Sequence, residues 1–184
     1  MRPSNRTKIL QAAVAVVERE GISALTFDAV AAEAEMTRGG IMYHFRSRTE
    51  LVEAIHAHMA QEWVTDQEKV LRDVAGGHPE EATQDDAAIA YLRGSSAAVT
   101  RAELQLQLEA STNPDAAEHW REASARILPD PPADAEDEEA ITRLLAVLVA
   151  DGLWIHEAVS FRTLDPEVRQ AIITRVEKLV RDGD

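Results

Sequence analysis

A short stretch in the first quarter of the chain gathers side chains that could hydrogen-bond to nucleic acid. Residues 37–45 read Thr-Arg-Gly-Gly-Ile-Met-Tyr-His-Phe. The guanidinium of Arg38 could donate a fork of two hydrogen bonds to O6 and N7 of guanine. The phenol of Tyr43 suits a phosphate oxygen, and the imidazole of His44 suits a phosphate or a base edge. The stretch therefore predicts contacts to DNA.

Two short helices with a tight joint would have to position these groups. Apolar residues recur at helical spacing from Phe27 to Ala31, and the hydroxyl of Thr26 can cap the first turn of that helix. After a break at 35–37, Thr37 can cap a second helix that runs to about His44. Such a pair has the geometry of a helix-turn-helix, in which the second helix enters the major groove of DNA. On spacing alone, an ordinary helical hairpin is an equal alternative.

The same stretch resembles a known family of DNA-binding proteins. The run from Thr37 to Phe45, followed by Arg-Ser-Arg-Thr-Glu-Leu at 46–51, resembles the recognition helix and the start of the fourth helix of TetR-type transcriptional regulators. Residues 9–26 are similar to that family's first helix and its exit. The resemblance implies an all-α fold: an N-terminal three-helix DNA-binding domain at 1–48, then a helical ligand-binding and dimerisation domain at 49–184.

The chain departs from the family pattern at two positions. Glu35 stands in the joint where the family usually carries glycine, and a non-glycine residue with positive φ is disfavoured. This turn could therefore have a different shape. The aromatic pair near the end of the recognition helix is reduced to Met42 and Tyr43, which leaves one phenol.

Residue types and the resemblance together give a set of candidate DNA contacts. Threonine hydroxyls and helix N-termini suit phosphates. The two glycines allow either close approach of the backbone to DNA or tight packing against the first helix. The resemblance implies that Arg48 holds the DNA backbone where relatives carry lysine, and Arg6 could belong to an N-terminal arm with Arg2. The predicted contacts are Arg6, Thr26, Thr37, Arg38, Gly39, Gly40, Tyr43, His44 and Arg48.

The charge distribution agrees with a DNA-reading N-terminus. The net charge of the whole chain is −14, which by itself argues against nucleic acid. Residues 1–48 nevertheless hold seven Lys/Arg and five Asp/Glu, a balance of +2, and residues 49–184 carry −16. The basic excess therefore coincides with the predicted helix-turn-helix. A protein-interaction module would not need its basic residues concentrated in residues 1–48.

Composition and motifs argue against several other classes of protein. Cysteine is absent, which excludes disulfides and thiolate metal sites. No apolar run is long enough to span a bilayer, and a cytoplasmic protein is expected. His56 and His58 lie about 200° apart around a helix, so they cannot share a metal. No catalytic or phosphate-loop motif is recognisable. We expect no enzyme activity, no metal and no cofactor.

Helical periodicity continues through the rest of the chain and predicts about nine helices in total. Ser47 and Glu50 form a capping box that opens a long fourth helix. Capping residues followed by proline predict two later helix starts, and the proline-rich stretch 129–134 predicts a break. The predicted helices cover 5–19, 27–34, 37–44, 47–74, 87–99, 101–110, 114–128, 137–161 and 166–181.

The last two helices are apolar over more than one stripe, which exceeds the needs of a helix packed on one side. They predict a homodimer through a four-helix bundle, with core inside one chain as the alternative. By the resemblance, this C-terminal domain would also enclose a small-molecule effector. Candidate ligand contacts, each with a core or interface role as the alternative, are Trp63, Gln67, Tyr91, Leu104, Gln105, Leu108, Trp120 and Trp154.

The predicted function is a ligand-responsive DNA-binding transcriptional regulator. In its simplest form it is a repressor that releases a palindromic operator when a small molecule binds. Two alternatives stay open: a helical protein-interaction module without DNA binding, and a regulator that activates or responds to no ligand.

Overall fold

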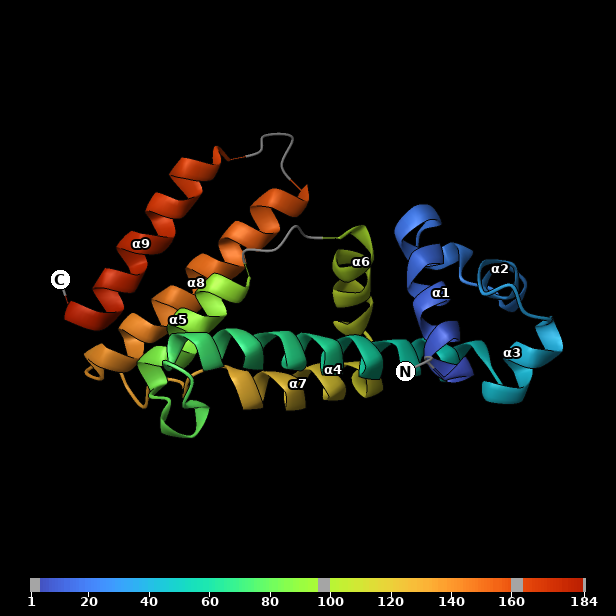
Figure 1. The fold of residues 1–184 in the computed structure, drawn as a ribbon, viewed down its shortest axis with the longest axis horizontal. Helices are drawn as coiled ribbons and strands as arrows, with labels where there is room; N and C mark the ends of the chain where they lie inside the picture. The colour runs from blue at the N-terminus through green and yellow to red at the C-terminus, as the bar shows by residue number, and fades with distance from the viewer. Residues whose placement is uncertain (1–3, 96–99, 160–163, 184) are drawn as a thin grey trace. The chain divides into compact units, whose positions relative to one another are not determined.

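The computed structural model describes residues 4–95, 100–159 and 164–183. These residues form nine α-helices and two short 3-10 turns, without strands, so the predicted all-α class is confirmed (Figure 1). The helices are α1 (Asn5–Glu20), α2 (Phe27–Glu33), α3 (Arg38–His44), α4 (Arg48–Val74), α5 (Gln84–Gly94), α6 (Arg101–Ala110), α7 (Pro114–Ile127), α8 (Glu138–Val159) and α9 (Pro166–Asp182). The 3-10 turns are η1 (Ile22–Ala24) and η2 (Pro79–Glu81).

The capping residues begin the helices of the helix-turn-helix as predicted. Thr26 Oγ1 accepts a hydrogen bond from Ala29 N at 3.1 Å, and Thr37 Oγ1 accepts one from Gly40 N at 3.1 Å. Each bond satisfies a backbone N–H that has no partner within its own helix. Gly21, with φ of 89°, follows the last residue of α1, which ends one residue beyond the predicted helix 5–19.

Helix α5 begins earlier than the predicted start at residue 87. Thr83 and Asp86 form a capping box, in which Thr83 Oγ1 accepts from Asp86 N at 3.1 Å and Asp86 Oδ2 accepts from Thr83 N at 3.0 Å. The acidic and polar residues 80–86 suit either a loop or a weak first turn by sequence, and residues 84–86 supply the first turn of the helix. The last part of the predicted helix 87–99, residues 96–99, lies outside the described residues, as do residues 160–161 of the predicted helix 137–161.

The chain divides into two compact units. Unit 1 comprises residues 1–62 and 100–122, and unit 2 comprises residues 63–99 and 123–184. Helix α4 contributes its first part to unit 1 and the rest to unit 2, and α7 is divided in the same way. Unit 1 thus adds α6 and most of α7 to the N-terminal helices. The functional division at residue 48 stays a prediction.

Unit 1 has a core that supports the helix-turn-helix. Ile9, Ile41 and Phe45 are fully buried in it. Helix α6 is joined to the N-terminal helices by two hydrogen bonds in which backbone N–H groups donate to side-chain oxygens. Glu18 Oε2 accepts from Ala102 N at 2.6 Å, and Gln105 Oε1 accepts from Ile22 N at 2.8 Å.

Within unit 2, α5, α8 and α9 lie side by side (Figure 1). Leu92, Leu153 and Ile173, one from each helix, share a buried cluster. Two ion pairs fasten the C-terminal helix. Arg93 on α5 donates to both carboxylate oxygens of Glu177, at 2.6 and 2.8 Å, and Arg169 Nε donates to Glu157 Oε1 on α8 at 2.7 Å.

Candidate nucleic-acid interface and ligand-binding cluster

Helix α3 turns its apolar side inward and its polar side to solvent. Ile41 and Phe45 are fully buried, whereas Arg38 is exposed and Tyr43 is 85% exposed. The rings of Tyr43 and His44 meet edge to face, with centroids 5.2 Å apart. A tyrosine so exposed adds little to the core, so its phenol is available to an external partner.

The guanidinium of Arg38 already has a partner within unit 1. Its Nη1 donates to Asp28 Oδ2 at 2.8 Å, and both side chains are exposed. An exposed ion pair of this kind contributes about 0–1 kcal/mol, so a base edge or phosphate could replace Asp28. Asp28 was not among the predicted site residues. It lies in the first turn of α2, and only the packing of α2 on α3 brings it to Arg38.

The two glycines of α3 have no close neighbour on α1. A Cβ on Gly39 would meet only Thr37 Oγ1, at 4.0 Å. On Gly40 it would meet Met36 Cε and Thr37 Oγ1, each at 3.4 Å. Packing against the first helix therefore does not account for these glycines. The open side at Gly39 leaves room for the close approach of another molecule.

The joint between α2 and α3 keeps a left-handed conformation without glycine. Glu35 has a φ of 51° and is the one non-glycine residue with positive φ in the described part of the chain. The expectation of a differently shaped turn is therefore wrong at this residue. An L residue in this region costs roughly 1 kcal/mol relative to glycine.

Two of the predicted DNA-contacting arginines have bonds within unit 1. Arg48 Nε donates to the carbonyl of Leu25 at 3.0 Å, and its Nη2 donates to the carbonyl of Ile22 at 2.9 Å. Arg6 lies in the first turn of α1 with its guanidinium 5.0 Å from the ring centroid of Phe45. Arg6 therefore belongs to the folded helix and not to an arm. Arg2, the other residue of the predicted arm, lies outside the described residues.

The two capping threonines use only their acceptor capacity. Thr26 Oγ1 and Thr37 Oγ1 each accept from a backbone N–H, which leaves the hydroxyl proton free to point elsewhere. A phosphate could accept that proton without disturbing the cap.

The eight predicted ligand contacts are divided between the two units. The amide oxygen of Gln105 accepts a hydrogen bond from Ile22 N, and Leu108 is 63% exposed. Trp63, Gln67, Tyr91 and Trp154 belong to unit 2, whereas Leu104, Gln105, Leu108 and Trp120 belong to unit 1.

Trp120 is part of a buried polar group in unit 1, which we call the His56 cluster: His56, Glu109, Asn113 and Trp120. His56 is fully buried, and its Nδ1 accepts from the indole Nε1–H of Trp120 at 3.1 Å. Its Nε2 lies 2.6 Å from Glu109 Oε2, and Glu109 Oε1 accepts from Asn113 Nδ2 at 3.0 Å.

The protonation of His56 follows from these contacts. Burial lowers the pKa of His56 below its ordinary value of 6.5, and the hydrogen bond to Glu109 opposes that shift only in part. Because Nδ1 accepts from Trp120, the neutral ring must carry its proton on Nε2, where it donates to Glu109. Both ring nitrogens are therefore satisfied.

A second group, the Tyr91 cluster, lies in unit 2 and consists of Trp63, Gln67, Tyr91, Gly94 and Asp151. The rings of Trp63 and Tyr91 meet edge to face with centroids 6.2 Å apart. The phenol of Tyr91 donates to Asp151 Oδ1 at 2.5 Å. Burial raises the pKa of Tyr91, and the bond to Asp151 raises it further. The proton therefore stays on the phenol, and the negative charge of the pair lies on Asp151.

Gln67 forms the buried end of the Tyr91 cluster. Gln67 is only 3% exposed, and its Oε1 has no hydrogen-bond partner among the residues that the structure describes. The amide fills the space beside Gly94, where an added Cβ would lie 2.4 Å from Oε1. The sequence predicted three members of this cluster, and missed Gly94 and Asp151.

Other kinds of site were also sought. The described residues contain no group of three or more side chains placed to hold a metal ion. None of the helices searched in that part of the chain has the length and apolar character to cross a bilayer.

Comparisons with known proteins agree with this geometry. A family model described as "Bacterial regulatory proteins, tetR family" matches residues 9–55, and one described as "Tetracyclin repressor-like, C-terminal domain" matches residues 85–181. A comparison with curated proteins found no match.

Several solved structures are similar over nearly the whole chain. A member of the TetR family from Streptomyces coelicolor A3 is 25% identical with a TM-score of 0.59, over 95% of this chain and 98% of that one. The multidrug binding protein EbrR complexed with malachite green is 27% identical with a TM-score of 0.59, over 95% and 98% of the two chains. The ethidium complex is 27% identical with a TM-score of 0.56, over 96% and 99%.

The C-terminal family model alone spans more than half of the chain. The protein therefore belongs to the TetR family of transcriptional regulators, which bind DNA and are not enzymes.

Proposed function

We propose that the protein is a ligand-responsive repressor that binds a palindromic operator as a homodimer and releases it when a small molecule binds. In this proposal residues 1–48 read DNA in the cytoplasm, and residues 49–184 bind the effector and the second subunit. The observation that carries the proposal is the outward side of α3. Arg38, Gly39 and Tyr43 offer a guanidinium, an open backbone and a phenol on one short helix.

The apolar surface of α8 supports a homodimer. Leu148 is 56% exposed and Ile155 is 48% exposed, which is costly for a helix that meets only water. Gly152 lies between them with no atom of the described residues within 4 Å of the position of a Cβ, so no contact in that part of the chain explains a glycine inside the helix. A second copy of α8 would cover the leucines and approach closely at the glycine. The exposed apolar residues of α8 are Leu144, Leu145, Leu148, Ile155 and Val159.

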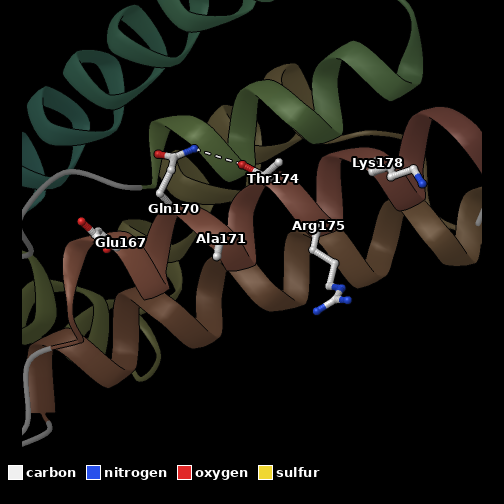
Figure 2. A pocket seen from close by; sticks show the side chains of 6 residues that line it. All are labelled: Glu167, Gln170, Ala171, Thr174, Arg175 and Lys178. Atoms are coloured by element: carbon white, nitrogen blue, oxygen red, sulfur yellow. Dashed lines mark hydrogen bonds between the residues drawn. The ribbon is translucent and has the colours of Figure 1, made fainter.

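The outward side of α9 is a shallow depression with small residues at its centre and longer polar ones around it. Figure 2 shows its lining: Glu167, Gln170, Ala171, Thr174, Arg175 and Lys178. Ala171 and Thr174 would admit another helix, and the charged side chains would form a polar rim. We propose that α8 and α9 of two subunits form a four-helix bundle.

Coupling between effector and DNA would run through α4. This single helix begins beside the helix-turn-helix at Arg48, and it carries Trp63 and Gln67 further along. Similarity to EbrR, solved with malachite green and with ethidium, supports a small-molecule effector. A coupling free energy of about 1–3 kcal/mol would change operator affinity by roughly 5–150-fold.

Selection from a pool of random DNA duplexes, combined with mass measurement in solution, tests the proposal. We expect a palindrome with half-sites one helical turn, ~34–36 Å, apart. Light scattering should give twice the chain mass of 20.2 kDa. Leu148→Glu should yield a monomer with weak operator binding, whereas the control Arg72→Glu, at an exposed residue of α4 outside the proposed interface, should remain dimeric. A wild-type monomer at micromolar concentration, or a pool without an enriched sequence, would refute the proposal.

A further inference from the structure

Asp151 is a half-buried carboxylate that lacks a cationic partner. Its Oδ1 accepts the proton of Tyr91, and no lysine, arginine or histidine of the described residues forms an ion pair with it. The neighbouring acid on the same helix differs, because Glu157 is paired with Arg169 at 2.7 Å. Charges that are taken partly out of water are normally paired. A positively charged group from outside the chain could form an ion pair with Asp151.

Aromatic rings lie next to this carboxylate. Tyr91 is in contact with both Asp151 and Trp63, and each of the three residues is partly exposed, so a ligand can reach them. Trp154 follows Asp151 by three residues, the spacing of one helix face. The faces of such rings attract cations, more strongly where water is excluded. The cluster therefore combines the negative charge of Asp151 with aromatic ring faces, which together favour a flat or apolar cation.

The buried amide of Gln67 is a second, independent polar group without a partner among the described residues. Its Oε1 has no partner in the described structure, although only 3% of the residue's surface is exposed. Buried acceptors in folded proteins almost always have a donor. Gln67 lies one helical turn from Trp63 on α4, and Gly94 beside it lies one turn from Tyr91 on α5. The unsatisfied acceptor thus belongs to the same group as the rings.

We propose that the Tyr91 cluster binds an organic cation, with Asp151 as its counter-ion, Trp63 and Tyr91 against its apolar surface, and Gln67 as an acceptor for an N–H group. The cluster presents acceptors and ring faces, while the phenol proton of Tyr91 is already used. An anionic ligand would face the charge of Asp151, and a neutral one would leave it unpaired. This inference rests on the proposed function, because it names the chemical class of the effector.

Calorimetric titration of the full-length protein with two ions of equal shape tests the proposal. Tetraphenylphosphonium and tetraphenylborate differ in the sign of their charge and little in size. We expect saturable binding of the phosphonium and none of the borate. Asp151→Asn should weaken phosphonium binding by about ten- to a hundredfold. Glu139→Gln, an exposed acid on the same helix, removes the same charge and should leave the affinity unchanged.

A second variant keeps the test independent of any misfolding of Asp151→Asn. Trp63→Leu retains the carboxylate and should weaken phosphonium binding by about two- to thirtyfold through the lost ring face. Equal binding of the two ions, or wild-type affinity in both variants, would overturn the cation site.

Operator binding by the same preparations separates this inference from the proposed function. Operator binding without discrimination between the two ions would remove the cation site and leave the repressor. Phosphonium binding that depends on Asp151, with no change in operator affinity, would keep the cation site and remove the ligand response.

Discussion

The two polar clusters each take side chains from α4, but they differ in whether their polar groups have partners. In the His56 cluster, both ring nitrogens of His56 have partners, and Glu109 accepts through both oxygens. In the Tyr91 cluster, Gln67 Oε1 has no partner in the described structure, and Asp151 has no cation there. The polar groups of the first cluster are therefore paired with one another, whereas the second cluster keeps an acceptor and a carboxylate that an external group could pair with.

This difference indicates where the fold tolerates unsatisfied polar groups or a strained backbone. A satisfied buried network rigidifies the helices that it joins, whereas an unsatisfied one costs stability unless something external completes it. Unit 1 has an imperfection of its own at Glu35, whose backbone is left-handed without glycine. That residue adjoins α3, the candidate DNA-reading helix. Strained or unsatisfied groups are expected at functional sites more than elsewhere.

The largest effect should come from breaking the satisfied cluster. His56→Ala removes the partners of Trp120 and Glu109 and leaves a cavity, so we expect the free energy of unfolding to fall by about 3 kcal/mol. Urea denaturation followed by tryptophan fluorescence measures it. His78→Ala, at an exposed histidine, should change stability by less than about 0.5 kcal/mol. Equal losses in the two variants would show that the His56 cluster contributes nothing special.

A smaller effect should distinguish the unsatisfied cluster. Gly94→Ala places a methyl group where the Gln67 amide lies, and should cost about 1–2 kcal/mol of unfolding free energy. In a Gln67→Ala background the same change should be neutral or stabilising, because the clash is gone and alanine favours the helix. A double-mutant cycle from urea denaturation gives the coupling. Additive effects would mean that the amide does not occupy this space.

The turn before α3 should respond in the opposite direction. Glu35→Gly relieves the left-handed backbone and should raise the free energy of unfolding by roughly 1 kcal/mol. Glu33→Gly is the comparison, because Glu33 ends α2 with an ordinary helical backbone, and glycine there should destabilise. Thermal unfolding of both variants measures the two signs. If Glu35→Gly lowers stability, the strain assigned to this turn does not exist.

The smallest effect should be a pH dependence that belongs to His56. Its pKa is lowered in the folded state, mainly by burial, so below pH 6.5 the unfolded chain binds a proton that the folded protein does not. Stability from this residue is therefore complete above pH 6.5 and declines as the pH falls toward the folded-state pKa. Denaturation curves across that range should be less steep in pH for His56→Gln than for wild type. Parallel curves would contradict the neutral, buried state of His56.

The parts of the fold that sequence predicted are those that local chemistry decides. Thr26 and Thr37 cap helices through their own hydroxyls, so the two helix starts could be predicted without tertiary structure. The start of α5 was left open, because the acidic run that holds the capping box of Thr83 and Asp86 suits either a loop or a weak first turn.

The parts that sequence could not predict depend on contacts between distant residues. Trp120 and Trp63 are equally plausible ligand contacts by residue type. Only the fold gives Trp120 a hydrogen bond to His56, 64 positions away, and places Trp63 against Tyr91. The pairing of Arg38 with Asp28 was hidden for the same reason.

The most direct test of the central claim, that α3 reads DNA through Arg38, compares binding to the selected operator and to a scrambled duplex. Arg38→Ala should lose about five- to 150-fold in affinity for the operator and little for the scrambled duplex, because the lost contact is to a base edge. Arg48→Ala should weaken binding to both. Equal losses on the two duplexes for Arg38→Ala would contradict the account.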